Sequence, residues 1–139
     1  MTALTGMATR PFADSTDSLL RFAMRLDATL TGLVGLFIAV GADPISSRTG
    51  LSSIAEYGVG AFFVFYGAVV FSLAAAPDLR RAGIGVVVAN VVFTVAAVIV
   101  VAAGALSLTE TGVAATLASG VYTAVIGYLQ YLGVRRLPA

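Results

Sequence analysis

Residues 82–106 read AGIGVVVANVVFTVAAVIVVAAGAL, a run of 25 residues without a charged side chain. A transmembrane helix needs about 20 predominantly apolar residues. The many valines would also suit a buried strand, but an apolar run of this length without turn residues favours a helix. The segment therefore predicts a helix that crosses a membrane.

Three further apolar segments predict three more spans, at residues 19–42, 58–76 and 112–134. The first of them reaches full length only if the turns that carry Arg21 and Arg25 are included. Asp43-Pro44 should end that helix, because proline disfavours helix at the preceding residue. A polar connection and a short helical turn at 51–57 should follow. We expect an all-α four-helix transmembrane bundle over residues 18–136, preceded by a flexible cytoplasmic tail at residues 1–17.

Composition supports a lipid environment. Hydrophobic residues make up 59% of the chain and charged residues only 11%, with a mean hydropathy of +1.00. Soluble domains carry about a quarter charged residues. The net charge of +1 and the lack of a long basic cluster exclude a nucleic-acid partner. The lipid bilayer is the expected partner.

All eight basic residues are arginine, and with four spans seven of them fall on one side of the membrane, leaving only Arg48 on the other. Basic residues mark the cytoplasmic side. Both termini are therefore expected in the cytoplasm. A chain rich in Ala and Val whose basic residues are all Arg is typical of a GC-rich genome, which favours a bacterial plasma membrane. The seven arginines expected on the cytoplasmic side are Arg10, Arg21, Arg25, Arg80, Arg81, Arg135 and Arg136.

The absence of His, Cys and Lys excludes the usual haem, iron–sulfur and zinc ligands, Schiff-base chemistry and His-dependent nucleophilic catalysis. The remaining acids look committed to helix ends. Ser53 with Glu56, and Ser107 with Glu110, match the capping-box spacing. Asp78 should open a helix, and Asp43 should close one. We therefore expect no catalytic, cofactor-binding or metal-binding residue, and no enzyme.

Asp27 is the acid that needs another explanation, because it lies inside the first span and faces away from Arg21 and Arg25. An unpaired charge in a membrane costs on the order of 3 kcal/mol at a helix centre. We expect Asp27 to pair with an arginine from another cytoplasmic helix end: Arg80, Arg81, Arg135 or Arg136. That pair would be structural, or else part of a proton- or cation-linked site.

Asn90, followed one turn later by Thr94, is a polar step inside an uncharged span. We interpret it as an interhelical hydrogen-bonding group, worth about 1 kcal/mol, rather than as a ligand contact. Small residues recur at helical spacing and predict close helix packing; they include Gly32, Gly35, Gly67, Gly120 and Gly127. Aromatic residues around Phe62 and Tyr66 should meet lipid, a partner or a hydrophobic ligand.

Residues 25–33 (RLDATLTGL) and 129–136 (LQYLGVRR) together resemble a family of small bacterial four-span membrane proteins, best represented in actinobacteria. The resemblance extends over most of residues 19–136. It implies a plasma-membrane location and no catalytic residues, and the family has no activity that could be carried over.

We expect a non-enzymatic scaffold or accessory subunit that acts as a homo-oligomer or within a larger membrane complex, because a bundle of this size should have little interior room. The alternative is an oligomeric small-solute or lipid transporter or channel, lined by Asp27, Thr31, Asn90 and Thr94. A membrane enzyme ranks third.

Overall fold

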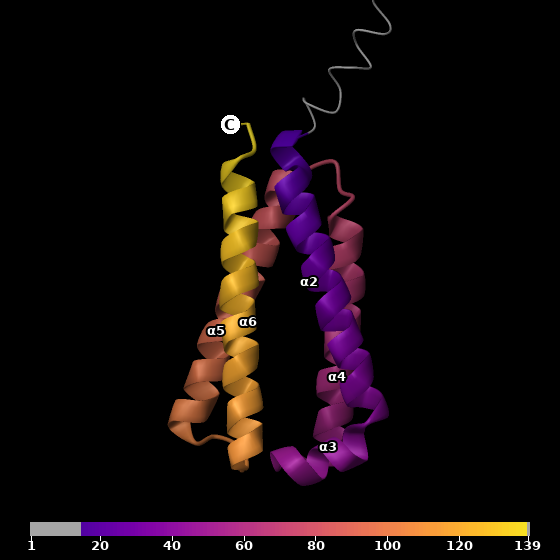
Figure 1. The fold of residues 1–139 in the computed structure, drawn as a ribbon, viewed down its shortest axis with the longest axis vertical. Helices are drawn as coiled ribbons and strands as arrows, with labels where there is room; N and C mark the ends of the chain where they lie inside the picture. Colours follow the sequence, from indigo (N-terminus) through magenta and orange to yellow (C-terminus); the bar gives the residue numbers. More distant parts are fainter. Residues whose placement is uncertain (1–14, 139) are drawn as a thin grey trace, which may run out of the picture.

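The computed structural model of the chain describes residues 15–138, and all its regular structure is helical (Figure 1). The predicted all-α fold is confirmed, with five helices in the described part rather than four. Four of them are long and apolar enough to cross a membrane. Ser15–Asp17, expected in the tail, belong to the first helix, and residues 1–14 lie outside the described residues. The helices are α2 (Ser15–Val40), α3 (Ala42–Thr49), α4 (Ser53–Leu73), α5 (Leu79–Ala103) and α6 (Glu110–Arg135).

The short helix α3 replaces the polar connection expected after Asp43-Pro44. Pro44 lies in the first turn of α3, where its missing N–H removes no helical hydrogen bond. Asp43 also lies in this turn, at the positive end of the helix dipole, and so opens α3 instead of closing α2. The helix ends at Gly50, whose φ of +87° is the left-handed conformation that glycine adopts readily.

Helix α4 begins one residue earlier than its expected capping box. Ser52, not Ser53, is the N-cap, and its hydroxyl accepts a hydrogen bond from the backbone N–H of Ala55. Glu56 is buried and accepts a hydrogen bond from the Thr49 hydroxyl. The expected role of Glu56 in capping is therefore wrong, and its carboxylate instead joins α4 to the end of α3.

Of the two remaining helix caps that were predicted, the one at Ser107 is wrong and the one at Asp78 is confirmed. Thr109 caps α6 by accepting from the backbone N–H of Gly112, so the expected cap at Ser107 is wrong and Glu110 is simply an exposed acid in the first turn. Asp78 caps α5 as expected, because its carboxylate accepts from the backbone N–H of Arg81.

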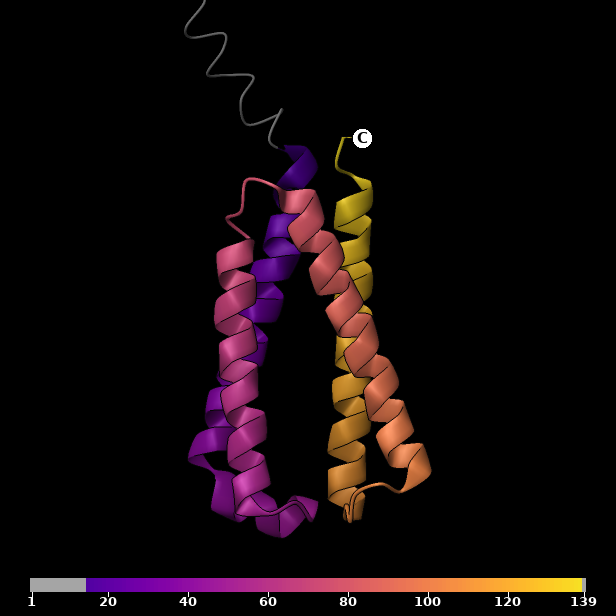
Figure 2. The same cartoon turned by 180° about the vertical axis from the view of Figure 1, so that it is seen from behind.

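The four long helices form two closely packed pairs (Figures 1 and 2). In the pair α2–α4, glycines allow the backbones to touch. A Cβ atom on Gly67 would lie 2.6 Å from the Ala28 carbonyl oxygen, and one on Gly35 would lie 2.6 Å from the Gly60 carbonyl oxygen. Any side chain at either position would push the helices apart.

The second pair, α5–α6, is packed less tightly. A Cβ atom on Gly120 would lie 3.3 Å from the Ala97 Cβ atom, and one on Gly127 would lie 3.1 Å from the Asn90 Cβ atom. Both distances reach side chains rather than backbone. The small residues of α6 therefore allow close approach of α5 without requiring contact between the backbones.

The two pairs meet at the end that holds the start of α2 and the end of α6. There, a Cβ atom on Gly133 would lie 2.7 Å from the Leu20 Cα atom. Side chains from all four long helices form a buried apolar cluster at this end: Leu20, Met24, Ala28, Val70, Ala74, Leu79, Val86 and Val134. Toward the opposite end the pairs diverge (Figure 2).

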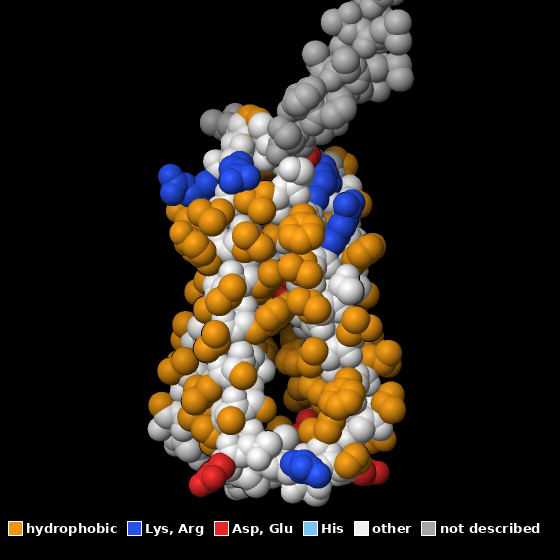
Figure 3. All heavy atoms as spheres, viewed as in Figure 1, with side chains coloured by type: hydrophobic (Ala, Val, Ile, Leu, Met, Phe, Trp, Pro, Cys, Tyr) orange, Lys and Arg blue, Asp and Glu red, His pale blue; other side chains and the backbone are white. Residues whose placement is uncertain are grey.

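Helix α3 joins the diverging ends. The Thr109 backbone N–H donates to the Thr49 carbonyl oxygen at 3.0 Å, and the Thr109 hydroxyl donates to the Arg48 carbonyl oxygen. The pairs are thus connected at both ends, and between the ends they contact through side chains such as Phe63 and Phe93, whose ring centroids lie 5.8 Å apart. The space-filling view shows apolar side chains along the flanks, charged side chains at the two ends, and a hollow between α2 and α6 in the half near α3 (Figure 3).

Candidate functional site

Asp27 lies at the level where the two helix pairs begin to diverge, and none of its surface is exposed. Three hydroxyl groups donate to its carboxylate. Thr31, one turn further along α2, donates to Oδ1 at 3.0 Å, Tyr122 of α6 donates to Oδ1 at 2.9 Å, and Tyr66 of α4 donates to Oδ2 at 2.9 Å. The carboxylate therefore links three helices.

Two amides complete the surroundings of Asp27. Nδ2 of Asn90 in α5 donates to Oδ2 at 3.1 Å, and Nε2 of Gln130 in α6 donates to the same oxygen at 3.0 Å. Asn90 Nδ2 also donates to Gln130 Oε1 at 2.8 Å. Five polar groups from all four long helices thus converge on one carboxylate. We call Asp27, Thr31, Tyr66, Asn90, Tyr122 and Gln130 the Asp27 cluster.

The arginine partner expected for Asp27 is not present. Arg80 donates to the carbonyl oxygens of Leu137 and Pro138, and the Arg135 guanidinium lies 5.9 Å from the centre of the Tyr131 ring. Arg81 and Arg136 are exposed at the same end of the bundle. Arg80 precedes Asn90 by ten residues, about 15 Å along a helix, and is therefore too far away to reach the Asp27 cluster.

The two polar residues predicted in α5, Asn90 and Thr94, make separate contacts. Asn90 belongs to the Asp27 cluster, whereas Thr94 lies one turn further along α5, 2.7 Å from the Thr123 hydroxyl of α6. Thr94 also donates to the Asn90 carbonyl oxygen. Of the predicted polar residues, Asp27, Thr31 and Asn90 are therefore in direct contact, and Thr94 forms a neighbouring contact between α5 and α6.

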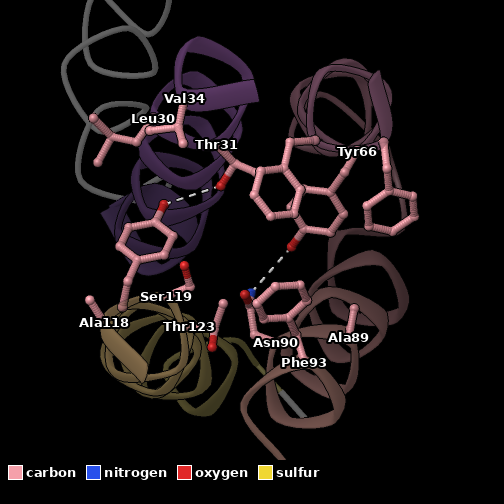
Figure 4. A pocket seen from close by; sticks show the side chains of 13 residues that line it. Leu30, Thr31, Val34, Tyr66, Ala89, Asn90, Phe93, Ala118, Ser119 and Thr123 are labelled. Atoms are coloured by element: carbon pink, nitrogen blue, oxygen red, sulfur yellow. Dashed lines mark hydrogen bonds between the residues drawn. The ribbon is translucent and has the colours of Figure 1, made fainter. Parts of the chain in front are cut away.

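A pocket of about 310 Å³ lies beside the Asp27 cluster, on the side away from the apolar cluster. All four long helices line it (Figure 4). Its walls are mostly apolar, with Phe62, Phe63 and Phe93 among them, whereas Thr31, Tyr66, Asn90 and Tyr122 bring the Asp27 cluster to its edge. Its other lining residues are Leu30, Val34, Ala89, Ala118, Ser119 and Thr123.

The two helix pairs are in contact at both ends of the bundle. Leu20 packs against Gly133 at one end, and Thr109 donates hydrogen bonds to α3 at the other. The hollow between α2 and α6 is on a flank, which in a membrane faces hydrocarbon (Figure 3). The pocket of about 310 Å³ gives the bundle more interior room than was expected from its size.

Two residues of the Asp27 cluster, Tyr122 and Gln130, were not among the predicted ones, and Tyr66 was predicted only as part of an aromatic surface. Tyr66 stands in a run of aromatic residues that is typical of a lipid-facing surface. Thr123, Gly127 and Gln130 follow one another at spacings of four and three, so they share a helix face, and this pattern could have indicated Gln130. Within residues 15–138, no group of three His, Cys, Asp or Glu side chains comes together to hold a metal ion.

Fold and site together define a multi-pass α-helical membrane protein with a buried acid and an adjoining intramembrane pocket. No protein-family model matches the chain, and no curated protein or solved structure shows significant similarity to it.

Proposed function

We propose that this chain is a bacterial plasma-membrane protein that takes a small amphipathic molecule from the bilayer into the pocket, as the binding step of a small-solute or lipid transporter. The pocket is the observation that carries this proposal. A volume of about 310 Å³ lies at the lower end of the range for small-molecule sites. Mostly apolar walls with a few polar groups at one edge are also typical of such sites.

The same pocket favours binding over a purely structural role as a scaffold. Filling the space with apolar side chains would stabilise a scaffold, because dispersion contacts are a main force between helices in lipid. Here the helices diverge beside a fully buried acid. A scaffold remains the second candidate and is distinguished by the experiment below.

The pocket is tested with photoreactive decanol, a neutral amphiphile, added to the purified protein in lipid nanodiscs. Wild-type protein should be labelled on peptides of α4 and α5 that line the pocket. Ser119→Phe places a ring where a small hydroxyl lines the pocket, so pocket labelling should fall at least fivefold. Peptide mapping by mass spectrometry gives the labelled fraction.

Ala124→Phe is the matched control, because Ala124 is exposed on the same helix and does not line the pocket. Pocket labelling should be unchanged in this variant. Labelling spread evenly over the exposed faces, and insensitive to Ser119→Phe, would contradict the binding proposal. Stoichiometric co-purification of another membrane protein together with that result would support the scaffold.

The proposed orientation, with both termini in the cytoplasm, rests on the arginines. Arg21, Arg80 and Arg135 lie near the start of α2, the start of α5 and the end of α6, which gather at one end of the bundle (Figure 1). Arg48 lies in α3 at the opposite end. Under the positive-inside rule, the end with more arginines is cytoplasmic.

The chain has no cysteine, so single cysteines can report this orientation directly. Ser47→Cys in α3 should react with a membrane-impermeant maleimide in intact cells whose outer membrane is permeabilised. Ala75→Cys, in the exposed turn before α5, should react only after lysis. The opposite pattern would reverse the orientation and leave the binding proposal untouched.

A further inference from the structure

The polar groups that line the pocket can accept hydrogen bonds from an occupant, because their own donor hydrogens are already used within the protein. The Thr31, Tyr66 and Tyr122 hydroxyls donate hydrogen bonds to the Asp27 carboxylate. Ser119 donates to the Ala115 carbonyl oxygen, and Thr123 is within hydrogen-bonding distance of the Gly120 carbonyl oxygen at 3.0 Å. What remains available to an occupant is the lone pairs of these oxygens.

Asn90 presents a further acceptor at the edge of the pocket. Its Nδ2 faces Asp27 Oδ2, Gln130 Oε1 and the Val86 carbonyl oxygen, which are all acceptors, so the network fixes the orientation of the amide. The Asn90 side chain is 3% exposed, yet within residues 15–138 no donor reaches its Oδ1. Every fully enclosed polar side-chain atom in that range has a partner, so Oδ1 opens to the pocket.

The acid behind these acceptors, Asp27, contacts no basic side chain within residues 15–138. In the same range, Arg21 forms an ion pair with Asp17, and the groups that contact Asp27 are all neutral. The Asp27 carboxylate is separated from the pocket by single side chains. In an apolar surrounding, a charge acts at this range with little screening.

We propose that the pocket binds a lipophilic amine in its cationic, ammonium form. This inference rests on the proposed function and names its ligand class. The ammonium N–H groups would donate to Asn90 Oδ1 and the neighbouring hydroxyl oxygens, and its charge would offset that of Asp27. The apolar part would lie against Phe62, Phe63 and Phe93, whose ring faces also attract cations.

Other occupants fit less well. A carboxylate or phosphate would face only acceptors and a charge of its own sign, which is unfavourable on both counts. A hydrocarbon chain would fill the walls but leave Asn90 Oδ1 without a hydrogen bond. A neutral alcohol supplies one donor and no charge, so its affinity should lie between that of the amine and that of the acid.

The test is a competition in nanodiscs, in which decylammonium, decanol and decanoate displace photoreactive decanol from the wild-type pocket. Decylammonium should have an apparent Kd at least tenfold below that of decanol, and decanoate should compete least. Competition is normalised to labelling of the exposed faces in the same sample, which corrects for different partitioning into lipid.

Asp27→Asn keeps the shape of the side chain and removes its charge. It should raise the apparent Kd of decylammonium at least tenfold, with a change of less than about threefold for decanol. If this variant does not fold, the competition series with the wild-type protein still tests the amine proposal. Equal competition by decylammonium and decanol would overturn the amine proposal and leave ligand binding intact, whereas absence of pocket labelling in the wild type would overturn both.

Discussion

Asp27→Leu is expected to lower the free energy of unfolding by about 3 kcal/mol or more, because it removes the common acceptor of five donors. A hydrogen bond between transmembrane helices contributes about 0.6 kcal/mol on average, which for five gives about 3 kcal/mol. A buried donor left without an acceptor adds a penalty of about 1–3 kcal/mol. All four long helices lose their shared contact at once.

The measurement is unfolding by SDS in mixed micelles, followed by near-ultraviolet circular dichroism of the tyrosines, two of which belong to the Asp27 cluster. Asp43→Leu is the control, because Asp43 is exposed in the first turn of α3 and should cost less than about 1 kcal/mol. Similar transitions for both variants would show that the hydrogen bonds of the Asp27 cluster do not hold the helices together.

Gly67→Leu should separate α2 from α4 and prevent recovery of folded, monodisperse protein. Even the Cβ atom of the new side chain would lie 2.6 Å from the Ala28 carbonyl oxygen and 3.0 Å from the Gly32 Cα atom. Both are backbone atoms, so no side-chain rotation relieves the clash. Overpacking usually costs about 1–3 kcal/mol, and a backbone clash belongs at the upper end of that range or beyond.

Gly58→Leu is the matched control for this substitution. Gly58 lies in the same helix, and a Cβ atom there would meet nothing within 4 Å. The control should elute at the same volume as the wild-type protein in size-exclusion chromatography, and its elution peak should be unchanged after mild heating. Gly67→Leu should aggregate. Equal behaviour of the two variants would mean that α2 and α4 are not held by close backbone packing.

The sequence was sufficient to predict the helices because their cause is local. A 25-residue uncharged run allows few structures besides a membrane-spanning helix, whatever surrounds it. Helix α3 escaped prediction for the opposite reason. Its eight residues are mostly polar, and it depends on tertiary contacts such as the hydrogen bonds from Thr109 to Thr49 and Arg48.

The site was predictable only in part. A buried acid in an apolar span needs partners, which singled out Asp27, but helical periodicity does not say which helices are neighbours. Arginine is the obvious partner by charge, yet the headgroup region holds it near water. Tyr66 and Tyr122 replace it with hydroxyl donors that tolerate burial because their rings are apolar.

The hydrogen bonds from Thr109 to Thr49 and Arg48, which join the start of α6 to the end of α3, have a mechanical consequence. Because the pairs are joined at both ends, widening the space between them without breaking either junction requires the helices to bend between the ends. Bending a helix lengthens the backbone hydrogen bonds on its outer side, whereas the open flank does not restrict the length of an occupant (Figure 3). An occupant of the kind proposed above would therefore be selected by its width more than by its length, because a narrow tail could extend through the open flank into the bilayer.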